Sequence, residues 1–379
     1  MKTRFEFPTR ILFGQGVIED MPEQILPLDV KRPLVVTDRG LMATDIPERI
    51  VNILRVNGLE PATFYKIDPN PTDEQVDTGS EAYDDHDGDC IVALGGGSPI
   101  DAAKGIQIRA DHHEPLEEYD DLKGGDSRIL GEMPPLVAIP TTAGTGSEVS
   151  RSAVITVAAA DRKVVLFSPR LMPALAVCDP ELTYELPARV TAETGMDALS
   201  HNIEAYLASG YHPMADGIAI RAIRMISDFL PKAVAQGNDP KARQEMLMAA
   251  TMGGVAFQKG LGVIHSLAHP LSSVTGLSHG LANSIMLPHA IRFNGSEIPN
   301  RVATIAAAMN SEDRTVEGAA EAIRALAEKT GLPTRLSDAG VTQEQIDELS
   351  DKAMQDGCHA SNPRECSIDD MRDIFTAAM

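Results

Sequence analysis

The stretch C-I-V-A-L-G-G-G-S-P-I-D-A-A-K, residues 90–104, decides the fold of this chain. Its five leading residues predict a buried strand, its three glycines a tight turn, and the residues after them a helix. Glycine lets the backbone approach a bound group closely, and a helix N-terminus presents free N–H groups to an anion. We therefore predict a diphosphate-binding turn at Gly95, Gly96 and Gly97, with an ordinary strand-to-helix turn as the alternative.

Two further apolar runs have the same form in the first half of the chain. Residues 32–38 and 136–139 predict strands, and the second leads into P-T-T-A-G-T-G-S-E at 140–148. Residues 4–13 predict an edge strand, and residues 154–169 a hairpin. Continuous apolar strands that alternate with helices indicate a parallel sheet covered on both faces.

The pattern changes after about residue 185. Strand signals end there, and apolar residues recur with helical spacing. The predicted helices span residues 187–207, 218–234, 241–257, 299–310, 316–329 and 343–354. We therefore predict an α/β nucleotide-binding domain with a mainly parallel, Rossmann-like sheet over residues 1–185, and an all-helical domain over residues 186–379.

The composition restricts the partners of the chain. It has 33 Lys and Arg against 55 Asp and Glu, a formal net charge of -22, and no dense basic cluster. Nucleic acid and an anionic membrane surface are therefore not expected as partners. Four cysteines without a C-x-x-C pair, and a start without an apolar leader, predict a cytoplasmic protein. A salt-adapted source is the alternative explanation of the acidity.

A cluster of carboxylate and imidazole groups predicts a metal site. Asp197 and His201 are four residues apart on a predicted helix, so both side chains lie on one face. His265, His269 and His279 follow within fifteen residues. Four N and O ligands suit Fe²⁺ or Zn²⁺. Five candidates are present, so one histidine is left as a reactive neighbour; we predict that Pro270 ends the helix that carries two of them.

Asp38 and the loop at 140–148 extend the nucleotide prediction. Asp38 ends its strand, where a carboxylate accepts a hydrogen bond from a ribose 2′-hydroxyl and repels a 2′-phosphate. This position favours NAD over NADP, with a turn aspartate as the alternative. The 140–148 loop supplies hydroxyls and flexible backbone for phosphate or nicotinamide contacts.

These motifs resemble the iron-activated, or type III, alcohol dehydrogenase family along nearly the whole chain. The segments that carry the resemblance are F-G-Q-G near residue 14, D-P-N-P-T at 68–72, G-G-G-S-P-I-D-A-A-K at 95–104, P-T-T-A-G-T-G-S-E-V at 140–149, G-M-D-A-L-S-H-N-I-E-A-Y at 195–206, the histidine segment at 262–280, L-P-H at 287–289 and N-P-R at 362–364. Their order and spacing both agree with the family.

The resemblance implies a role for each matching residue. It implies metal ligation by Asp197, His201, His265 and His279, and a proton-relay role for His269 beside the nicotinamide. The residues that it assigns to the cofactor are Asp38, Asn70, Gly95, Gly96, Gly97, Ser98, Asp101, Thr141, Thr142, Thr145, Ser147, Lys163 and Leu182. The native metal is expected to be Fe²⁺, with Zn²⁺ as the alternative.

The function that follows is reversible hydride transfer between a small alcohol and NAD, in a homodimer or a larger homo-oligomer. We expect the site in a cleft between the two domains. Glycerol, diols and 4-hydroxybutyrate are alternative substrates. A lyase of the dehydroquinate synthase type and a non-catalytic assembly subunit are alternative functions.

Overall fold

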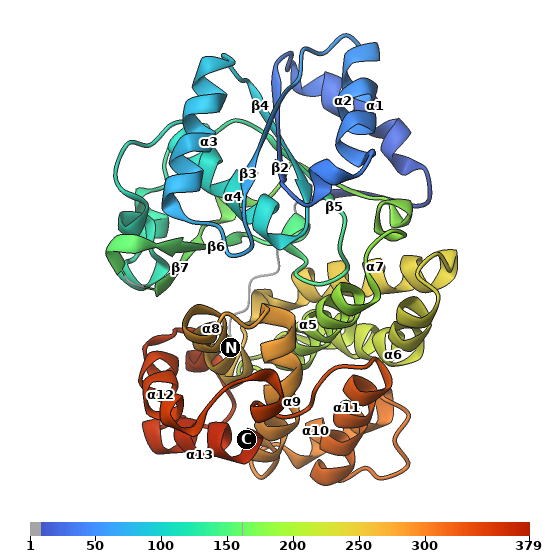
Figure 1. Cartoon of the computed structure of the whole chain (residues 1–379), viewed down its shortest axis with the longest axis vertical. Helices are drawn as coiled ribbons and strands as arrows, with labels where there is room; N and C mark the ends of the chain where they lie inside the picture. Colours follow the sequence, from blue (N-terminus) through green and yellow to red (C-terminus); the bar gives the residue numbers. More distant parts are fainter. Residues whose placement is uncertain (1–8, 161) are drawn as a thin grey trace. The chain divides into compact units, whose positions relative to one another are not determined.

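The computed structural model describes residues 9–160 and 162–379. The chain forms two compact units (Figure 1). Among the described residues, one contains residues 9–142 together with Ser147–Thr183, and the other contains Ala143–Gly146 and Tyr184–Met379. The short segment Ala143–Gly146 therefore belongs to the helical unit, although the residues on both sides of it belong to the α/β unit.

A parallel sheet of six strands forms the centre of the α/β unit. Its strands are β1 (Arg10–Phe13), β2 (Pro33–Asp38), β3 (Ala62–Ile67), β4 (Cys90–Gly95), β5 (Leu136–Pro140) and β8 (Leu175–Cys178), in the order β1-β8-β5-β4-β2-β3. Two further strands, β6 (Ser152–Val157) and β7 (Arg162–Phe167), form an antiparallel hairpin. The predicted strands, hairpin and Rossmann-like fold are confirmed; β3 and β8 were not predicted.

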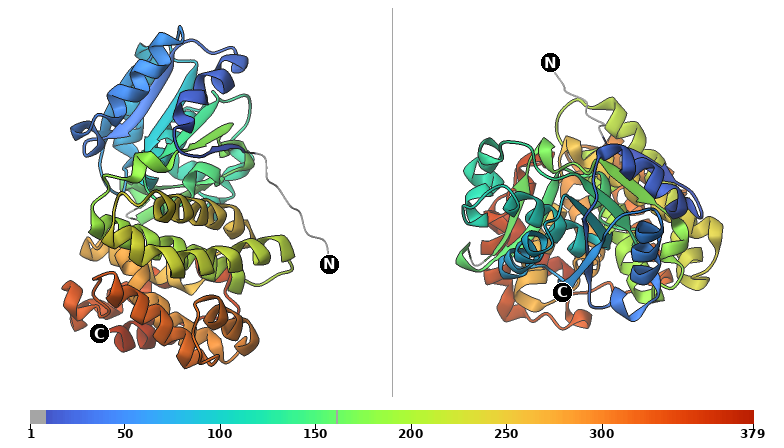
Figure 2. Two further views of the ribbon diagram at one scale, coloured as in Figure 1. Left: turned by 90° about the vertical axis from the view of Figure 1, so that its right-hand side faces the viewer. Right: turned by 90° about the horizontal axis from the view of Figure 1, so that it is seen from above.

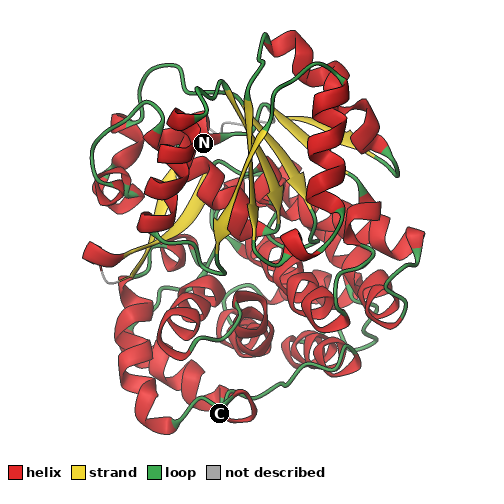
Figure 3. Ribbon diagram, turned by 45° about the horizontal axis from the view of Figure 1, so that its top comes forward, coloured by secondary structure: helices red, strands yellow, loops and turns green. Residues whose placement is uncertain are grey.

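Side chains alternate between the two faces of this sheet, and helices cover both (Figures 1 and 3). Val36 and Ala93 pack with α3 (Asp73–Asp85) and α4 (Gly97–Arg109). Val35 and Val92 pack with α1 (Met21–Ile25) and α2 (Ile46–Val56) on the other face. Burial on both faces is the reason that the strands are continuous apolar runs in the sequence.

Helices make up the second unit, as predicted. They are α5 (Ala188–Leu207), α6 (Pro213–Ala235), α7 (Pro240–Ala256), α8 (Val263–Thr275), α9 (His279–Gly295), α10 (Pro299–Ala308), α11 (Val316–Lys329), α12 (Ile346–Gln355) and α13 (Ile368–Ala378). Helix α5 packs against α6, α7 and α9, and α8 packs against α9 and α12. Figure 2 shows these helices from two further directions.

Three expectations about element ends need correction or restriction. Pro270 does not end its helix, because α8 continues to Thr275. A proline removes one hydrogen bond of the helix, and the buried side chains of Leu267 and Leu271 hold the helix by packing. Pro187 is the residue before α5 and not part of its first turn. The predicted edge strand is β1, and its first residues, 4–8, lie outside the described residues.

Within residues 9–160 and 162–379, no single helix has both the length and the apolar composition of a membrane span. The helical segments Pro240–Lys259 and Val263–Thr275 reach that length and apolar composition only when they are taken together, and the chain bends by 112° between them.

Candidate metal and nucleotide sites

Three helices bring together the four residues predicted as metal ligands. Asp197 and His201 lie one turn apart on α5, His265 is in the first turn of α8, and His279 begins α9. One ligand atom from each of the four lies within 4.8 Å of the others. The imidazole rings of His201 and His265 are stacked, with centroids 4.6 Å apart.

The unsatisfied polar atoms of this cluster fit a divalent cation. Nδ1 of His201 and Nε2 of His265 are buried and have no hydrogen-bond partner among the described residues. Oδ2 of Asp197 lies 3.9 Å from Nδ1 of His201, and Oδ1 of Asp197 lies 3.5 Å from Nε2 of His279. Buried nitrogens without a partner are costly in a folded protein. A cation held by three imidazoles and one carboxylate satisfies these nitrogens, and this donor set suits Fe²⁺ or Zn²⁺.

Two residues that the sequence did not single out hold the predicted ligands in place. Glu204 of α5 accepts hydrogen bonds from the N–H groups of Ile264 and His265, at 2.6 and 3.4 Å, and its second oxygen bonds Nδ1 of His265. Asn283 donates to Oδ1 of Asp197 at 2.8 Å. Carboxylates that bond the remote nitrogen of a metal-binding histidine fix its tautomer, so Nε2 of His265 is the nitrogen left for a cation.

The pKa values of two predicted ligands shift in opposite directions, although burial opposes a charge on both. Burial lowers the pKa of His201 to about 4, although the charge of Asp197 opposes this shift. Burial also opposes a charge on His265, but Glu204 outweighs it and raises the pKa of His265. His201 is therefore neutral near pH 7, which is the protonation state that a metal ligand requires.

His269 lies beside the cluster and is held by a different carboxylate. It is one turn after His265 on α8, and its ring stacks on that of His279 with centroids 5.3 Å apart. Nδ1 of His269 is 2.7 Å from Oδ2 of Asp356, which follows α12. Burial alone would raise the pKa of Asp356, but His269 and the donors around the carboxylate hold it well below its usual range. Asp356 was not predicted.

In the α/β unit, five neighbouring strands end at one edge of the sheet. The predicted cofactor residues at this edge are Asn70 after β3, Asp38 at the end of β2, Gly95 at the end of β4 with Gly96, Gly97 and Ser98 after it, Thr141 and Thr142 after β5, and Leu182 after β8. The carboxyl ends of parallel strands are where open α/β sheets bind ligands. The sheet thus brings together residues that are up to 144 positions apart, from Asp38 to Leu182.

The glycine turn requires its glycines. Gly95 has a φ of +144°, and a Cβ atom there would lie 2.7 Å from Pro99 and 3.3 Å from Oδ2 of Asp38. A Cβ atom on Gly96 would lie 3.2 Å from Thr142. The amide of Thr141 donates to the carbonyl of Gly95 at 3.0 Å, so the two predicted loops are in direct contact.

The start of α4 joins the second loop through Asp101 and Lys104. Ser147 donates to Oδ1 of Asp101 at 2.6 Å, and the buried Lys104 ammonium donates to carbonyl and hydroxyl oxygens of Ser147 and Ser150 at 2.8 to 3.1 Å. Burial lowers the pKa of Lys104 to about 8. Lys163 pairs with Thr156 in the hairpin. These contacts give Asp101 and Ser147 a structural role in ordering the loop, so contact with a cofactor is a proposal for them.

Thr145 is placed by the helical unit. On either side of it, a Cβ atom on Gly144 would lie 2.8 Å from Thr194, and a Cβ atom on Gly146 would lie 2.6 Å from the backbone of Gly254. The segment around Thr145 therefore packs closely on α5 and α7.

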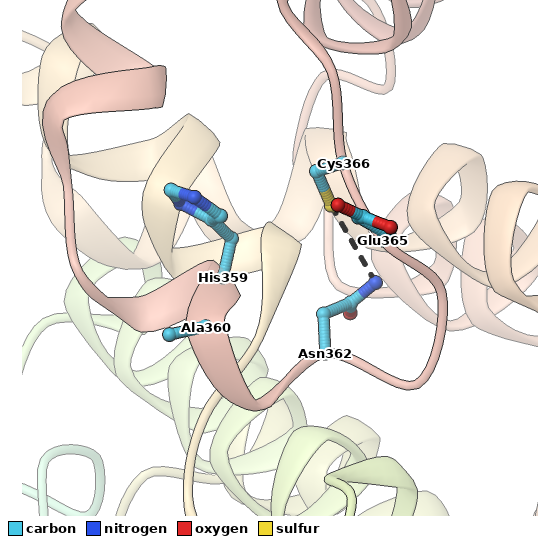
Figure 4. A pocket seen from close by; sticks show the side chains of 5 residues that line it. All are labelled: His359, Ala360, Asn362, Glu365 and Cys366. Atoms are coloured by element: carbon cyan, nitrogen blue, oxygen red, sulfur yellow. Dashed lines mark hydrogen bonds between the residues drawn. The ribbon is translucent and has the colours of Figure 1, made fainter.

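A pocket of about 360 Å³ opens near the C-terminus, lined by His359, Ala360, Asn362, Glu365 and Cys366 (Figure 4). The side-chain NH₂ group of Asn362 donates to Sγ of Cys366 at 3.6 Å, and its side-chain oxygen accepts from the N–H of Val263 at 3.2 Å. Asn362 thus fastens this segment to the start of α8. The residues that line this pocket do not include any predicted ligand or cofactor residue.

A Rossmann-like sheet and a buried cluster of His and Asp in one chain are typical of metal-dependent dehydrogenases. Two family models match: iron-containing alcohol dehydrogenase over residues 8–180, and the C-terminal part of the Fe-containing alcohol dehydrogenase family over residues 191–379. The chain belongs to the iron-containing alcohol dehydrogenase family, as the sequence motifs predicted. It is an NAD-linked oxidoreductase that acts on CH–OH groups.

Similar proteins extend over the full length of the chain. A 4-hydroxybutyrate dehydrogenase of Cupriavidus necator is 40% identical, with 98% of both chains covered. An NAD-dependent methanol dehydrogenase of Bacillus methanolicus is 37% identical, with 100% of both covered. A solved structure of a 1,3-propanediol oxidoreductase aligns with a TM-score of 0.95 at 36% identity, and covers 100% of both chains.

Proposed function

We propose that this alcohol dehydrogenase holds a divalent ion with Asp197, His201, His265 and His279, and interconverts short-chain alcohols and aldehydes at that ion. The observation that carries the proposal is the convergence of four donor atoms within 4.8 Å, from three helices. Nδ1 of His201 and Nε2 of His265 in this cluster are buried without a hydrogen-bond partner among the described residues. A divalent ion held there supplies a Lewis acid that lowers the pKa of a hydroxyl group. Iron is the proposed native ion, since the family is iron-containing.

His269 is proposed to exchange the hydroxyl proton of the substrate. Its ring stacks on the ligand His279 and stands edge-on to the ligand His265, with centroids 5.3 and 5.9 Å away. It is not one of the proposed ligands, and its Nδ1 contacts an acid outside the ligand set, Asp356. A neutral histidine with one free nitrogen is suited to proton transfer near pH 7.

The edge of the sheet is proposed to bind NAD, which accepts the hydride. The glycine turn leaves room for a diphosphate, and the N-terminus of α4 directs its N–H groups at the same place. Asp38 is proposed to accept a hydrogen bond from the ribose and to exclude a 2′-phosphate. This role of Asp38 supports NAD over NADP as the coenzyme. By contrast, a similar protein of Clostridium saccharobutylicum carries the name NADPH-dependent butanol dehydrogenase.

The substrate is proposed to be a small primary alcohol or diol. Similar proteins carry the names 4-hydroxybutyrate, methanol and 1,3-propanediol dehydrogenase. Their substrates have in common a short chain with a terminal hydroxyl group. Assays should begin with ethanol, butanol, 1,3-propanediol and 4-hydroxybutyrate.

A paired substitution tests the site. His265→Ala should lose the bound ion and activity together, whereas His269→Ala should keep one ion per chain and lose turnover. Metal content is measured by elemental analysis, and turnover by NADH absorbance with the alcohol panel. His113→Ala, an exposed residue of the other unit, is the matched control. Full turnover in chelator-treated protein, or loss of metal in neither variant, would refute the assignment.

We propose a homo-oligomer that acts in the cytoplasm. The sheet ends at β1, and Ile11 on this edge strand is 42% exposed, which is a surface suited to pairing with a second copy. The four cysteines form no disulfide with one another, in agreement with a reducing compartment. Light scattering of the purified protein tests the first statement, and fractionation of the source cells tests the second.

A further inference from the structure

Asp356 makes three contacts that together set the orientation of its carboxylate. Oδ2 is 2.7 Å from Nδ1 of His269. Oδ1 accepts from the hydroxyl of Ser266 at 2.8 Å and from the N–H of Cys358 at 2.8 Å. The hydroxyl of Ser266 in turn accepts from the N–H of His359 at 2.9 Å. Each carboxylate oxygen therefore has its own donors, and only Oδ2 faces the imidazole.

This arrangement is distinct from the one that holds the ligand His265. The partner of His265 is Glu204, from α5, whereas Asp356 lies between α12 and the segment Cys358–Ser361. Asn362, just after that segment, also bonds the start of α8. Two residues of this region therefore hold α8. Asp356 bonds Ser266, 90 positions away in the sequence, and Asn362 bonds Val263, 99 positions away.

We propose that Asp356 is a positioning residue for the reaction: it keeps the proton of His269 on Nδ1 and leaves Nε2, on the opposite side of the ring, to exchange the hydroxyl proton of the alcohol. This inference rests on the proposed role of His269. Nothing in the contacts of Asp356 requires it to touch the substrate.

The chemistry balances with His269 as the proton acceptor. When the alcohol is oxidised, its O–H bond breaks and the proton passes to Nε2, while the C–H bond breaks and its electron pair leaves as hydride to NAD. The carbon–oxygen double bond of the aldehyde forms at the same time. His269 is then an imidazolium ion, and its second N–H remains bonded to Asp356 until Nε2 returns the proton to water. The carboxylate stabilises this charged intermediate state of the ring.

Asp356→Asn separates positioning from packing. An asparagine has nearly the same volume, and its carbonyl oxygen can still accept from Ser266 and from Cys358. Its NH₂ group then faces His269 and can only donate, so Nδ1 must become an acceptor and the proton moves to Nε2. The variant should hold the ring in place with the wrong nitrogen protonated.

The experiment compares Asp356→Asn with His269→Ala and with the double variant. Asp356→Asn should lower kcat by about 10²-fold or more, with the KM for the alcohol and the metal content unchanged. Nitrogen-15 NMR of the Zn²⁺-loaded protein should show the His269 proton moved from Nδ1 to Nε2. The double variant should be no slower than His269→Ala, since both changes act through one group. Asp351→Asn, an exposed acid on α12, is the control.

The outcomes distinguish this inference from the proposed function. If His269→Ala turns over normally, the role of His269 fails. If His269→Ala is slow but Asp356→Asn keeps its kcat or its tautomer, only the positioning role is overturned. A second metal equivalent that is lost in Asp356→Asn would also overturn it, because His269, Asp356 and Cys358 lie within 4.8 Å of one another and would then be ligands.

Discussion

His201 and His265 show how a single nitrogen atom can indicate a ligand. In each ring one nitrogen is buried and has no hydrogen-bond partner within the described chain, and these two nitrogens belong to the same cluster. The other nitrogen of His265 is occupied by Glu204. A histidine that serves only to fill a core has no reason to leave its second nitrogen unbonded at a cost of about 1–3 kcal/mol.

Asp38 should determine which coenzyme is used. Asp38→Gly should raise the ratio of kcat/KM for NADP to that for NAD by about tenfold or more, because a repulsive charge opposite a phosphate is removed. The carboxylate also accepts from the N–H of Leu41 at 2.8 Å, so the variant loses a turn contact as well. Asp38→Asn keeps an acceptor for Leu41 and isolates the charge. An unchanged ratio in both variants, equal to that of the exposed control Asp45→Asn, would remove Asp38 from this role.

His289 should make the protein less stable in mild acid. Burial, with help from Arg292, lowers the pKa of His289 to about 4 from 6.5. Since the unfolded chain binds the proton more readily, its contribution is complete above about pH 6.5 and is lost as the pH falls toward 4. The loss between pH 7 and 5 should be on the order of 1 kcal/mol once partial exposure is discounted.

His289→Gln checks this effect by difference. Thermal midpoints of metal-free wild type and variant, measured from pH 7 to pH 5, contain the same contributions from all other histidines. The midpoint of the variant should fall less than that of the wild type. Parallel curves for the two proteins would show that His289 titrates normally.

The sequence singled out the predicted ligands but not the residues that support them. His265 and His279 stand out because histidines are few and these are close together in the chain. Glu204, Asn283 and Asp356 carry no such signal, because their partners lie 61, 86 and 87 positions away. A single acid in a helix or a turn is usually solvated, and only the packing of α5, α8 and α9 shows otherwise.

At the scale of elements, α8 is positioned by side chains from elsewhere. Gly262 precedes it and gives no side-chain cap. Instead Glu204 accepts from Ile264 and His265, and Asn362 accepts from Val263. A Cβ atom on Gly262 would lie 3.0 Å from Oε1 of Glu204, so the glycine permits this close approach. The first turn of α8, and with it His265, is therefore fixed by two other segments of the chain.

Glu204→Gln should weaken metal binding without removing a ligand. The Kd for Zn²⁺, measured by competition with a chromophoric chelator, should rise about 10- to 100-fold, as is usual when the partner of a metal-binding histidine is changed. Glutamine keeps the size of the side chain, but it has one oxygen that accepts and an NH₂ group that can only donate. Glu317→Gln removes an exposed acid that pairs with Arg292 and should leave the Kd unaltered. A wild-type Kd in Glu204→Gln would mean that packing alone orients His265.

The predicted elements were most accurate where every residue of the element is buried. Strands β4 and β5 are apolar along their length because both faces are covered, so the sequence predicted them within a residue or two. Strand β3 was missed because half of its side chains are exposed. The end of α8 was misplaced because Pro270 reads locally as a stop, while its helix is held by packing that the local sequence does not reveal.

For the whole molecule, the net charge of -22 is the feature that the two sites do not explain. Many acids are paired at the surface, as in the contacts of Arg324 with Glu321 and Glu328 and of Arg372 with Asp347 and Asp369. Exposed pairs of this kind contribute about 0–1 kcal/mol each. The acids outnumber all Lys and Arg by 55 to 33, so repulsion among the unpaired ones opposes the compact state.

Salt should therefore stabilise this protein. The screening length falls from about 10 Å at 0.1 M salt to about 3 Å at 1 M, which weakens repulsion among distant acids more than attraction within close pairs. The thermal midpoint of the metal-saturated protein should rise by a few degrees, roughly the effect of 1 kcal/mol, between 0.05 and 1 M KCl. Because sulfate also strengthens apolar burial, KCl and not a sulfate salt isolates screening. A midpoint that keeps rising above 1 M would indicate salt adaptation, whereas a plateau fits an ordinary acidic protein. A midpoint that falls as KCl is added would show that ion pairs dominate the surface and that repulsion does not limit stability.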